Sequence, residues 1–367
     1  MADVLVSADV DAVVVYGNDT SRHDVRYLTA WPPGWDTICC WVPGNLPRLY
    51  LPSPNHVPGA AQMSAGLAEA RDAGVDMAET VAADLRAVLQ GLGGRRRVGT
   101  IGPMPAWLQR RLVHALDGIE LVDIGAAFRS MRLIKSDEEL AWTRRSAALC
   151  DAGIVALVDA ARAGMRDDEL VAAVEHAYRR LGGEHGICFL ASAPMDGGGR
   201  VVPSPYPSRR VLEAGDAVSI ELSAGVGGTT GQVLRTVAIG DDIPAAFQRV
   251  HEVADAAFAA ITSAIKPGAT ASDLLAAAAL IDDAGFTVVD DVVHGYGGGY
   301  LPPVLRTPAT QTRPVPDLRL EPGMLLVVQP NVVDFVAGIG VQTGELVAVS
   351  ESGFDSLHSA EQGLLFA

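Results

Sequence analysis

Along the first 125 residues, short hydrophobic segments typical of strands alternate with segments whose hydrophobic positions are spaced as in helices. An apolar, β-branched run at 11–16 ends in turn-forming residues, and two further strands, 39–42 and 48–51, flank a Pro-Gly-Asn turn. A helix is expected at 78–89 and another strand at 97–101. The pattern predicts a small α/β unit.

The rest of the chain is patterned as pairs of helices, each pair followed by strand-like segments. Ser136 and Glu139 form a capping box that opens a helix over 137–163. The other expected helices are 167–181, 245–265 and 272–284, and the expected strands are 211–222, 233–239, 324–328 and 345–349. This order predicts an α+β domain built from two similar halves, with a domain boundary just before the capping box.

Charge and composition restrict the partners of the chain. It carries 28 Lys and Arg against 44 Asp and Glu, a net charge of −16, and 49% of its residues are hydrophobic. Such an acidic protein repels phosphate backbones and anionic membrane surfaces, so we expect neither nucleic acid nor a membrane as partner. The start of the chain lacks a secretory signal pattern, and its four cysteines lack disulfide spacing. We therefore expect a cytoplasmic protein.

Several separated motifs occur in a fixed order in the second part of the chain. They are Gly215–Glu221, Gln232–Thr236, His294-Gly295, Glu321–Met324 running on to Gln329-Pro330, and Gly340–Gln342. Together they resemble the creatinase, aminopeptidase P and methionine aminopeptidase superfamily, the M24-like proteins. Their order and spacing make this resemblance far more specific than any single motif would be.

The resemblance covers the whole chain and implies a fold. It implies an α+β, pita-bread catalytic domain over 132–367, with its pocket on a curved sheet, preceded by a creatinase-like α/β domain over 1–128. It also implies a homodimer. Residues 26–29 resemble a strand signature of the smaller domain, and 132–136 resemble the entry to the catalytic domain.

The resemblance further implies a site, which differs from that of the family's peptidases. Those enzymes hold two metal ions with Asp, Asp, His, Glu and Glu. Matched motif by motif, these ligands fall on Glu221, Gln232, His294, Gln329 and Gln342. Glu221 offsets one of four positive charges, and amides are weak ligands that do not bridge metals. We expect no metal and no other cofactor, with a single ion on His294 and Glu221 as the alternative.

Two further histidines of the family are replaced here. Ser204 stands twelve residues before Asp216, where creatinase has its acid–base His, and Leu301 stands where the peptidases have a second His. Neither creatine hydrolysis nor peptide hydrolysis therefore transfers directly. His294 is predicted as the acid or base, with Glu221 as its partner or as a second acid.

Polar groups around these positions are the candidates for binding a small-molecule substrate. They are Gln232, Gln329, Gln342, Tyr296, Tyr300, Arg306 and Ser204. The glutamines suit a neutral or zwitterionic ligand, or alternatively fill an emptied pocket with mutual hydrogen bonds. Tyr296, Tyr300 and Arg306 flank a glycine run and are equally compatible with packing.

Three functions are compatible with these motifs and residues. The favoured one is a metal-independent enzyme that hydrolyses, or eliminates across, a C–N bond of a small amino-acid-like, amide or amidine substrate. The alternatives are a non-catalytic peptide- or metabolite-binding protein of this fold and an Xaa-Pro-type metallopeptidase, the latter inherited from the fold alone.

Overall fold

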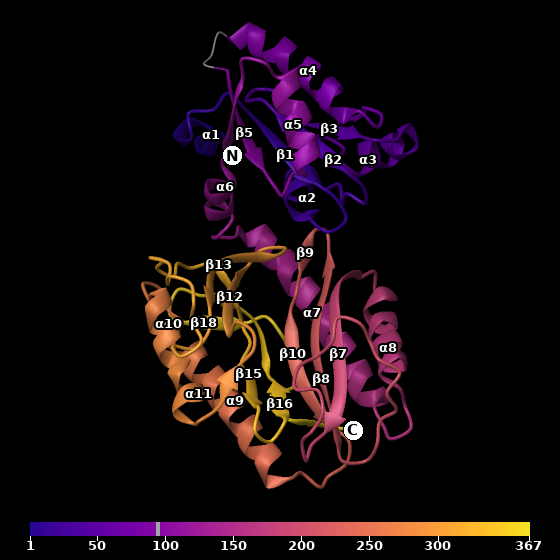
Figure 1. The fold of residues 1–367 in the computed structure, drawn as a ribbon, viewed down its shortest axis with the longest axis vertical. Coiled ribbons are helices and arrows are strands. Elements are labelled where there is room, and N and C mark those ends of the chain that lie inside the picture. Colours follow the sequence, from indigo (N-terminus) through magenta and orange to yellow (C-terminus); the bar gives the residue numbers. More distant parts are fainter. Residues whose placement is uncertain (93–95) are drawn as a thin grey trace. The chain divides into compact units, whose positions relative to one another are not determined.

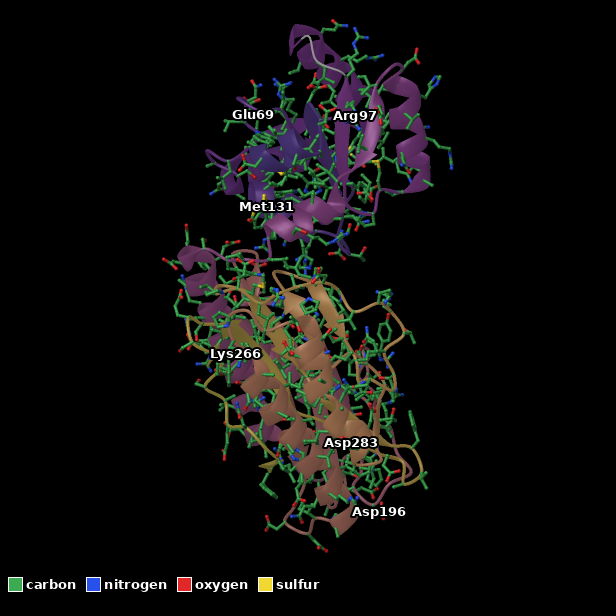
Figure 2. All side chains as sticks on the ribbon, turned by 90° about the vertical axis from the view of Figure 1, so that its left-hand side faces the viewer. Glu69, Arg97, Met131, Asp196, Lys266 and Asp283 are labelled. Atoms are coloured by element: carbon green, nitrogen blue, oxygen red, sulfur yellow. The ribbon has the colours of Figure 1, made fainter. Side chains whose placement is uncertain are left out.

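The chain forms two compact units in the computed structural model, which describes residues 1–92 and 96–367. The first unit comprises Met1–Arg132 and the second Leu133–Ala367 (Figure 1). Exposed side chains such as those of Glu69, Asp196, Lys266 and Asp283 mark the surfaces of the units (Figure 2). Within the described residues, no helix has the length and apolar character needed to cross a bilayer.

A six-stranded mixed sheet, in the order β4-β3-β2-β1-β5-β6, forms the centre of the first unit. Its strands are β1 Ala12–Gly17, β2 Thr37–Trp41, β3 Arg48–Leu51, β4 Glu69–Asp72, β5 Arg97–Ile101 and β6 Glu120–Asp123. Its helices are α1 Ala2–Ser7, α2 His23–Thr29, α3 Val57–Met63, α4 Met77–Leu92, α5 Ala106–Ala115 and α6 Gly125–Met131, with a 3-10 turn at Pro54–His56. Cys39 and Cys40 point to opposite faces of β2, into two separate apolar clusters.

Several features of this unit differ from the sequence prediction, which also lacked helices α1, α3 and α6. Residues 26–29, expected as a strand, lie in α2, where Val25 and Thr29 are buried four residues apart, one turn of a helix. Strands β4 and β6 were not predicted. Both are four-residue edge strands whose end residues are exposed and acidic, so they lack the apolar pattern of buried strands.

The second unit contains a ten-stranded sheet, whose main path runs β13-β12-β14-β17-β10-β8-β7. Its strands are β7 Glu184–Pro194, β8 Asp216–Val226, β9 Thr229–Thr230, β10 Val233–Ala238, β12 Val293–Tyr296, β13 Tyr300–Leu305, β14 Leu325–Val328, β17 Gly344–Val349, β18 Phe354–Ser356 and β19 Leu365–Phe366. A smaller sheet joins β11 Thr287–Val288, β15 Asn331–Asp334 and β16 Ile339–Gln342. The strand expected at 211–222 begins only at Asp216.

Helices cover the two halves of this sheet separately (Figure 1). They are α7 Asp137–Ala160 and α8 Asp167–Arg179 in one half, and α9 Ala245–Ala264, α10 Ala271–Ala277 and α11 Ala279–Asp283 in the other. The first pair shares an apolar cluster with β7, β8 and β10, and the second group packs against β12, β14, β15 and β16. The Ser136–Glu139 capping box opens α7, as predicted. The helix expected at 272–284 is divided at Ala278.

Candidate active site

The predicted ligand positions lie on neighbouring strands of the second unit. Glu221 lies within β8, Gln232 directly precedes β10, His294 lies in β12, Gln329 follows β14, and Gln342 ends β16. All five side chains are buried. Strand β8 pairs with β10, and β12 pairs with β14, each in antiparallel orientation. Gln232 and Gln329, 97 positions apart in sequence, are in hydrogen-bond contact.

A line of hydrogen bonds connects two carboxyl groups through two amides. Gln232 Nε2 donates to Glu221 Oε1 over 2.8 Å and to Gln329 Oε1 over 3.2 Å. Gln329 Nε2 in turn donates to Asp291 Oδ2 over 3.2 Å. We call these four side chains the Glu221–Asp291 network. Both glutamines thus act as donors toward acidic groups, which removes the cost of burying unpaired amides.

His294 lies beside this network, fully buried. Its Nδ1 is 3.1 Å from the carbonyl oxygen of Gly295, and hydrogen bonding with the Gln329 side chain opposes the effect of burial on the pKa of the imidazole. The ring of Tyr300 stacks on the imidazole with 3.9 Å between ring centroids. The Tyr300 hydroxyl donates to Asp291 Oδ1 over 3.2 Å, so Tyr300 joins the histidine to the network. About half of Tyr300 remains exposed.

Burial shifts the titration of these groups in opposite directions. Burial and, second to it, the nearby charge of Asp290 raise the pKa of Glu221 to about 7, against the opposing effect of the Gln232 hydrogen bond. Burial and Asp290 raise the pKa of Asp291 to about 8. Burial lowers the pKa of His294 to about 4. At neutral pH these shifts favour an uncharged His294, and they bring the titration of the two carboxyl groups closer to neutrality.

The arrangement does not fit the family's pair of metal ions. Glu221 is the only carboxylate among the five positions, and the side chains of Gln232 and Gln329 beside it are neutral amides, which are weak ligands. Residues 1–92 and 96–367 contain no group of three or more His, Cys, Asp or Glu side chains placed to hold an ion. The donor set also lacks the carboxylates that would offset four positive charges.

Of two other predicted residues, Tyr296 lies close to the histidine and Gln342 lies in the smaller sheet. Tyr296, in β12, is buried, and its ring centroid is 5.7 Å from that of His294. Its hydroxyl is hydrogen-bonded to Thr230 Oγ1 at 2.6 Å, which gives it a packing role. Gln342 pairs with Asn331 across β15 and β16, and its Oε1 has no hydrogen-bond partner among the described residues.

Ser204 and Arg306 are engaged elsewhere. Arg306 donates to the carbonyl oxygen of Val288 over 3.3 Å. Ser204 forms a backbone bridge with Leu190, and its hydroxyl donates to the carbonyl oxygen of Tyr206. Ser204 lines a separate cavity of about 250 Å³ whose buried acid is Asp167. The structure therefore shows no contact of either residue with the Glu221–Asp291 network.

Comparison with known proteins now identifies the family. Residues 141–351, more than half of the chain, match the model of metallopeptidase family M24. The chain belongs to this family. It is 26% identical over 248 residues to an Xaa-Pro dipeptidase of Pyrococcus furiosus, covering 67% of this chain and 69% of the relative. It is 28% identical over 257 residues to a putative dipeptidase of Bacillus subtilis, YkvY, covering 70% and 68%.

Solved structures establish the fold. An X-Pro aminopeptidase from Thermotoga maritima superposes with a TM-score of 0.84 at 20% identity, covering 100% of this chain and 98% of that one. An Xaa-Pro dipeptidase from Bacillus anthracis gives 0.80 at 22% identity, covering 100% and 98%. The predicted α+β, pita-bread architecture with a preceding α/β unit is thereby confirmed.

Asp290 and Asp291 were not among the predicted site residues. Asp291 is buried, and it accepts hydrogen bonds from both Gln329 and Tyr300. The available signal was an acidic pair three and four residues before His294, directly ahead of an apolar strand. Two adjacent acids in a turn are common on surfaces, so the pair gained meaning only from its position beside Gln329.

Proposed function

We propose that this chain hydrolyses a C–N bond of a small polar substrate with two carboxyl groups and without the family's pair of metal ions. The observation that carries the proposal is the Glu221–Asp291 network, in which two buried acids are held by amides that occupy metal-ligand positions. The relatives that are named dipeptidases support a peptide-like bond as the C–N bond that is hydrolysed. The C–N bond of an amidine is the other candidate.

The two acids divide the proton transfers between them. Burial raises the pKa of Glu221 to about 7 and that of Asp291 to about 8, so near neutral pH Glu221 can act as the base and Asp291 as the acid. Glu221 takes a proton from water as the oxygen bonds to the carbonyl or amidine carbon. Asp291 gives its proton to the nitrogen as the C–N bond breaks. Water is thus divided between the two products, and a proton exchange with solvent restores the starting state.

His294 contributes a hydrogen-bond acceptor in this scheme. Its Nδ1 faces a carbonyl oxygen, which can only accept, so Nδ1 carries the proton and Nε2 keeps its lone pair. The imidazole accordingly orients a donor group of the substrate or the attacking water. Replacement of His294 by Ala is expected to abolish turnover while the unit still folds.

A metal-dependent Xaa-Pro dipeptidase is the second candidate, favoured by membership of family M24. Metal content and turnover of purified protein, measured on Xaa-Pro dipeptides and small amidines before and after chelation, separate the two. We expect metal well below one ion per chain and chelator-resistant turnover. Chelator-sensitive turnover that a divalent ion restores would establish the second candidate, and binding without turnover would establish a binding protein.

Variants of the two acids test their roles. Glu221→Gln and Asp291→Asn each keep the side-chain shape and remove the titrating group, so each is expected to lower kcat at least a hundredfold. Glu351→Gln is the matched control, because Glu351 is exposed. Turnover of both site variants at the rate of the control would contradict the proposal.

A further inference from the structure

A turn of three glycines joins the strand that carries His294 to the strand that begins with Tyr300. Residues Gly297–Gly299, which we call the glycine turn, lie between β12 and β13, and Gly297 N donates to Gly299 O over 3.1 Å. Gly298 and Gly299 adopt φ angles of +73° and +150°, a region that favours glycine. Because glycine has more backbone freedom than any other residue, the place of this turn depends on the side chains that pack against it.

The position of the glycine turn matters because Tyr300 follows it directly. The Tyr300 ring stacks on His294 with 3.9 Å between ring centroids, and its hydroxyl donates to Asp291 Oδ1 over 3.2 Å. Tyr300 is also the cross-strand partner of Tyr296, at the other end of the turn. A displacement of the turn therefore moves the tyrosine ring relative to both the histidine and the acid.

Two side chains pack against the first residue of the glycine turn. A Cβ atom at Gly297 would lie 2.7 Å from Leu301 Cδ1 and 3.3 Å from Lys135 Nζ, so both side chains lie directly against the glycine backbone. Leu301 is buried and stands where the resemblance places a second His of the family's peptidases. In this chain that position thus supplies an apolar contact to the turn.

The Lys135 side chain is itself held by the surrounding backbone. It is buried, and its Nζ donates to the carbonyl oxygen of Leu133 over 2.9 Å. Its backbone N–H donates to the carbonyl oxygen of Gly323 over 3.0 Å, and the preceding Ile134 forms an antiparallel bridge with Met324, directly before β14. Burying an ammonium group costs free energy, which hydrogen bonds to carbonyl oxygens offset. The ammonium group is therefore fixed where it touches the turn.

We infer that Lys135 is a positioning residue for the reaction. Its side chain, together with that of Leu301, fixes the glycine turn, and the turn in this place holds Tyr300 against His294. Lys135 thus acts through Tyr300 and not on the reacting atoms. The inference rests on the proposed function, because it adds a residue to the same site, but the support of the turn is measurable without turnover.

Hydrogen exchange of the purified protein, followed by mass spectrometry, tests the support of the glycine turn. Lys135→Met keeps an unbranched side chain and removes the ammonium donor, so we expect the amides of 296–301 to exchange at least tenfold faster. Amides of β8 should keep their rate, which separates a local effect from general destabilisation. Lys266→Met is the matched control, because Lys266 is exposed and is the only other lysine in the sequence. Unchanged exchange at 296–301 would overturn the inference.

A second variant keeps the test open if Lys135→Met does not fold. Leu301→Val removes the Cδ1 atom that lies against Gly297 and keeps an apolar residue suited to a strand. We expect exchange of the same amides to rise at least threefold, again with β8 unchanged. Exchange at the wild-type rate in this variant would contradict a turn that is fixed by the side chains around it.

Kinetics test the step from the glycine turn to Tyr300. Lys135→Met is expected to lower kcat at least tenfold and to change KM less than twofold, because the affected contacts serve the bond-breaking step. In a Tyr300→Leu background, which already lacks the stacked ring and its hydroxyl, the same substitution should change kcat less than twofold. An equal loss of kcat in both backgrounds would overturn the inference that Lys135 acts through Tyr300.

Failure of this inference is distinguishable from failure of the proposed function. Faster exchange in Lys135→Met, with no hydrolysis of any C–N substrate by the wild type, would leave the support of the turn in place and contradict the proposed function. Metal-independent hydrolysis by the wild type, with unchanged exchange and kcat in Lys135→Met, would do the reverse.

Discussion

Glu221→Gln should make the protein inactive and, above neutral pH, more stable. Burial raises the pKa of Glu221 from 4.5 to about 7, so ionising this side chain costs more in the folded than in the unfolded chain. At about 1.4 kcal/mol for each pH unit, the full difference corresponds to about 3 kcal/mol. Glutamine never ionises, and its Oε1 can still accept from Gln232, so the variant avoids this cost.

The sign of the pH dependence follows from the raised pKa. Below pH 4.5 the side chain is protonated in both states, and the wild-type protein carries no penalty. The penalty grows as pH rises from 4.5 toward about 7 and is complete above it. The stability advantage of Glu221→Gln should therefore increase from about 1 kcal/mol near pH 5 to about 3 kcal/mol near pH 8.

Urea denaturation of both proteins at the two pH values measures this advantage, together with turnover on the substrate that the wild type accepts. The exposed Glu351→Gln variant should show neither change. An advantage that stays constant with pH, or a variant less stable than the wild type near pH 8, would refute the reasoning that Glu221 is a desolvated acid.

Three further predictions concern the same unit. The pH profile of kcat/KM should rise as Glu221 ionises near pH 7 and fall as Asp291 ionises near pH 8, and a profile flat from about pH 6 to 9 would contradict the assignment. Tyr300→Phe removes a hydrogen bond that lowers the pKa of Asp291, so the falling limb should move to higher pH; an unmoved limb would exclude the contact. Arg235→Met leaves Glu345 buried without its cation and should cost about 3–5 kcal/mol in urea denaturation, while a loss below about 1 kcal/mol would show the pair to be dispensable.

Local signals in the sequence predicted much of the fold. The capping box at Ser136 is a contact between residues three apart, so the sequence contains all of its parts. All residues of β1 are buried, on both faces of the strand, so its continuous apolar run predicts a strand. Residues 26–29 were assigned wrongly because that strand rested on a resemblance to a family signature, and four residues are too few for a local pattern to separate a strand from a helix.

The candidate site was only partly accessible by the same route. Motif order brought out His294, Glu221 and the glutamines, because each lies at a fixed place in a strand-forming segment. It did not bring out Asp291, whose importance comes from hydrogen bonds to Gln329 and Tyr300 across strands. Nor could the sequence show that Arg306 donates a hydrogen bond to the carbonyl oxygen of Val288 and does not contact the network.

The sequence by itself determined that one carboxylate, one histidine and three amides stand where the resemblance places metal ligands, because charge is a property of residue type. Only the tertiary structure decided which groups titrate near neutrality. Burial disfavours charge, and it raises the pKa of Glu221 and Asp291 while lowering that of His294. Burial depends on what the other strands and side chains place around a residue, and no local pattern of residues records that.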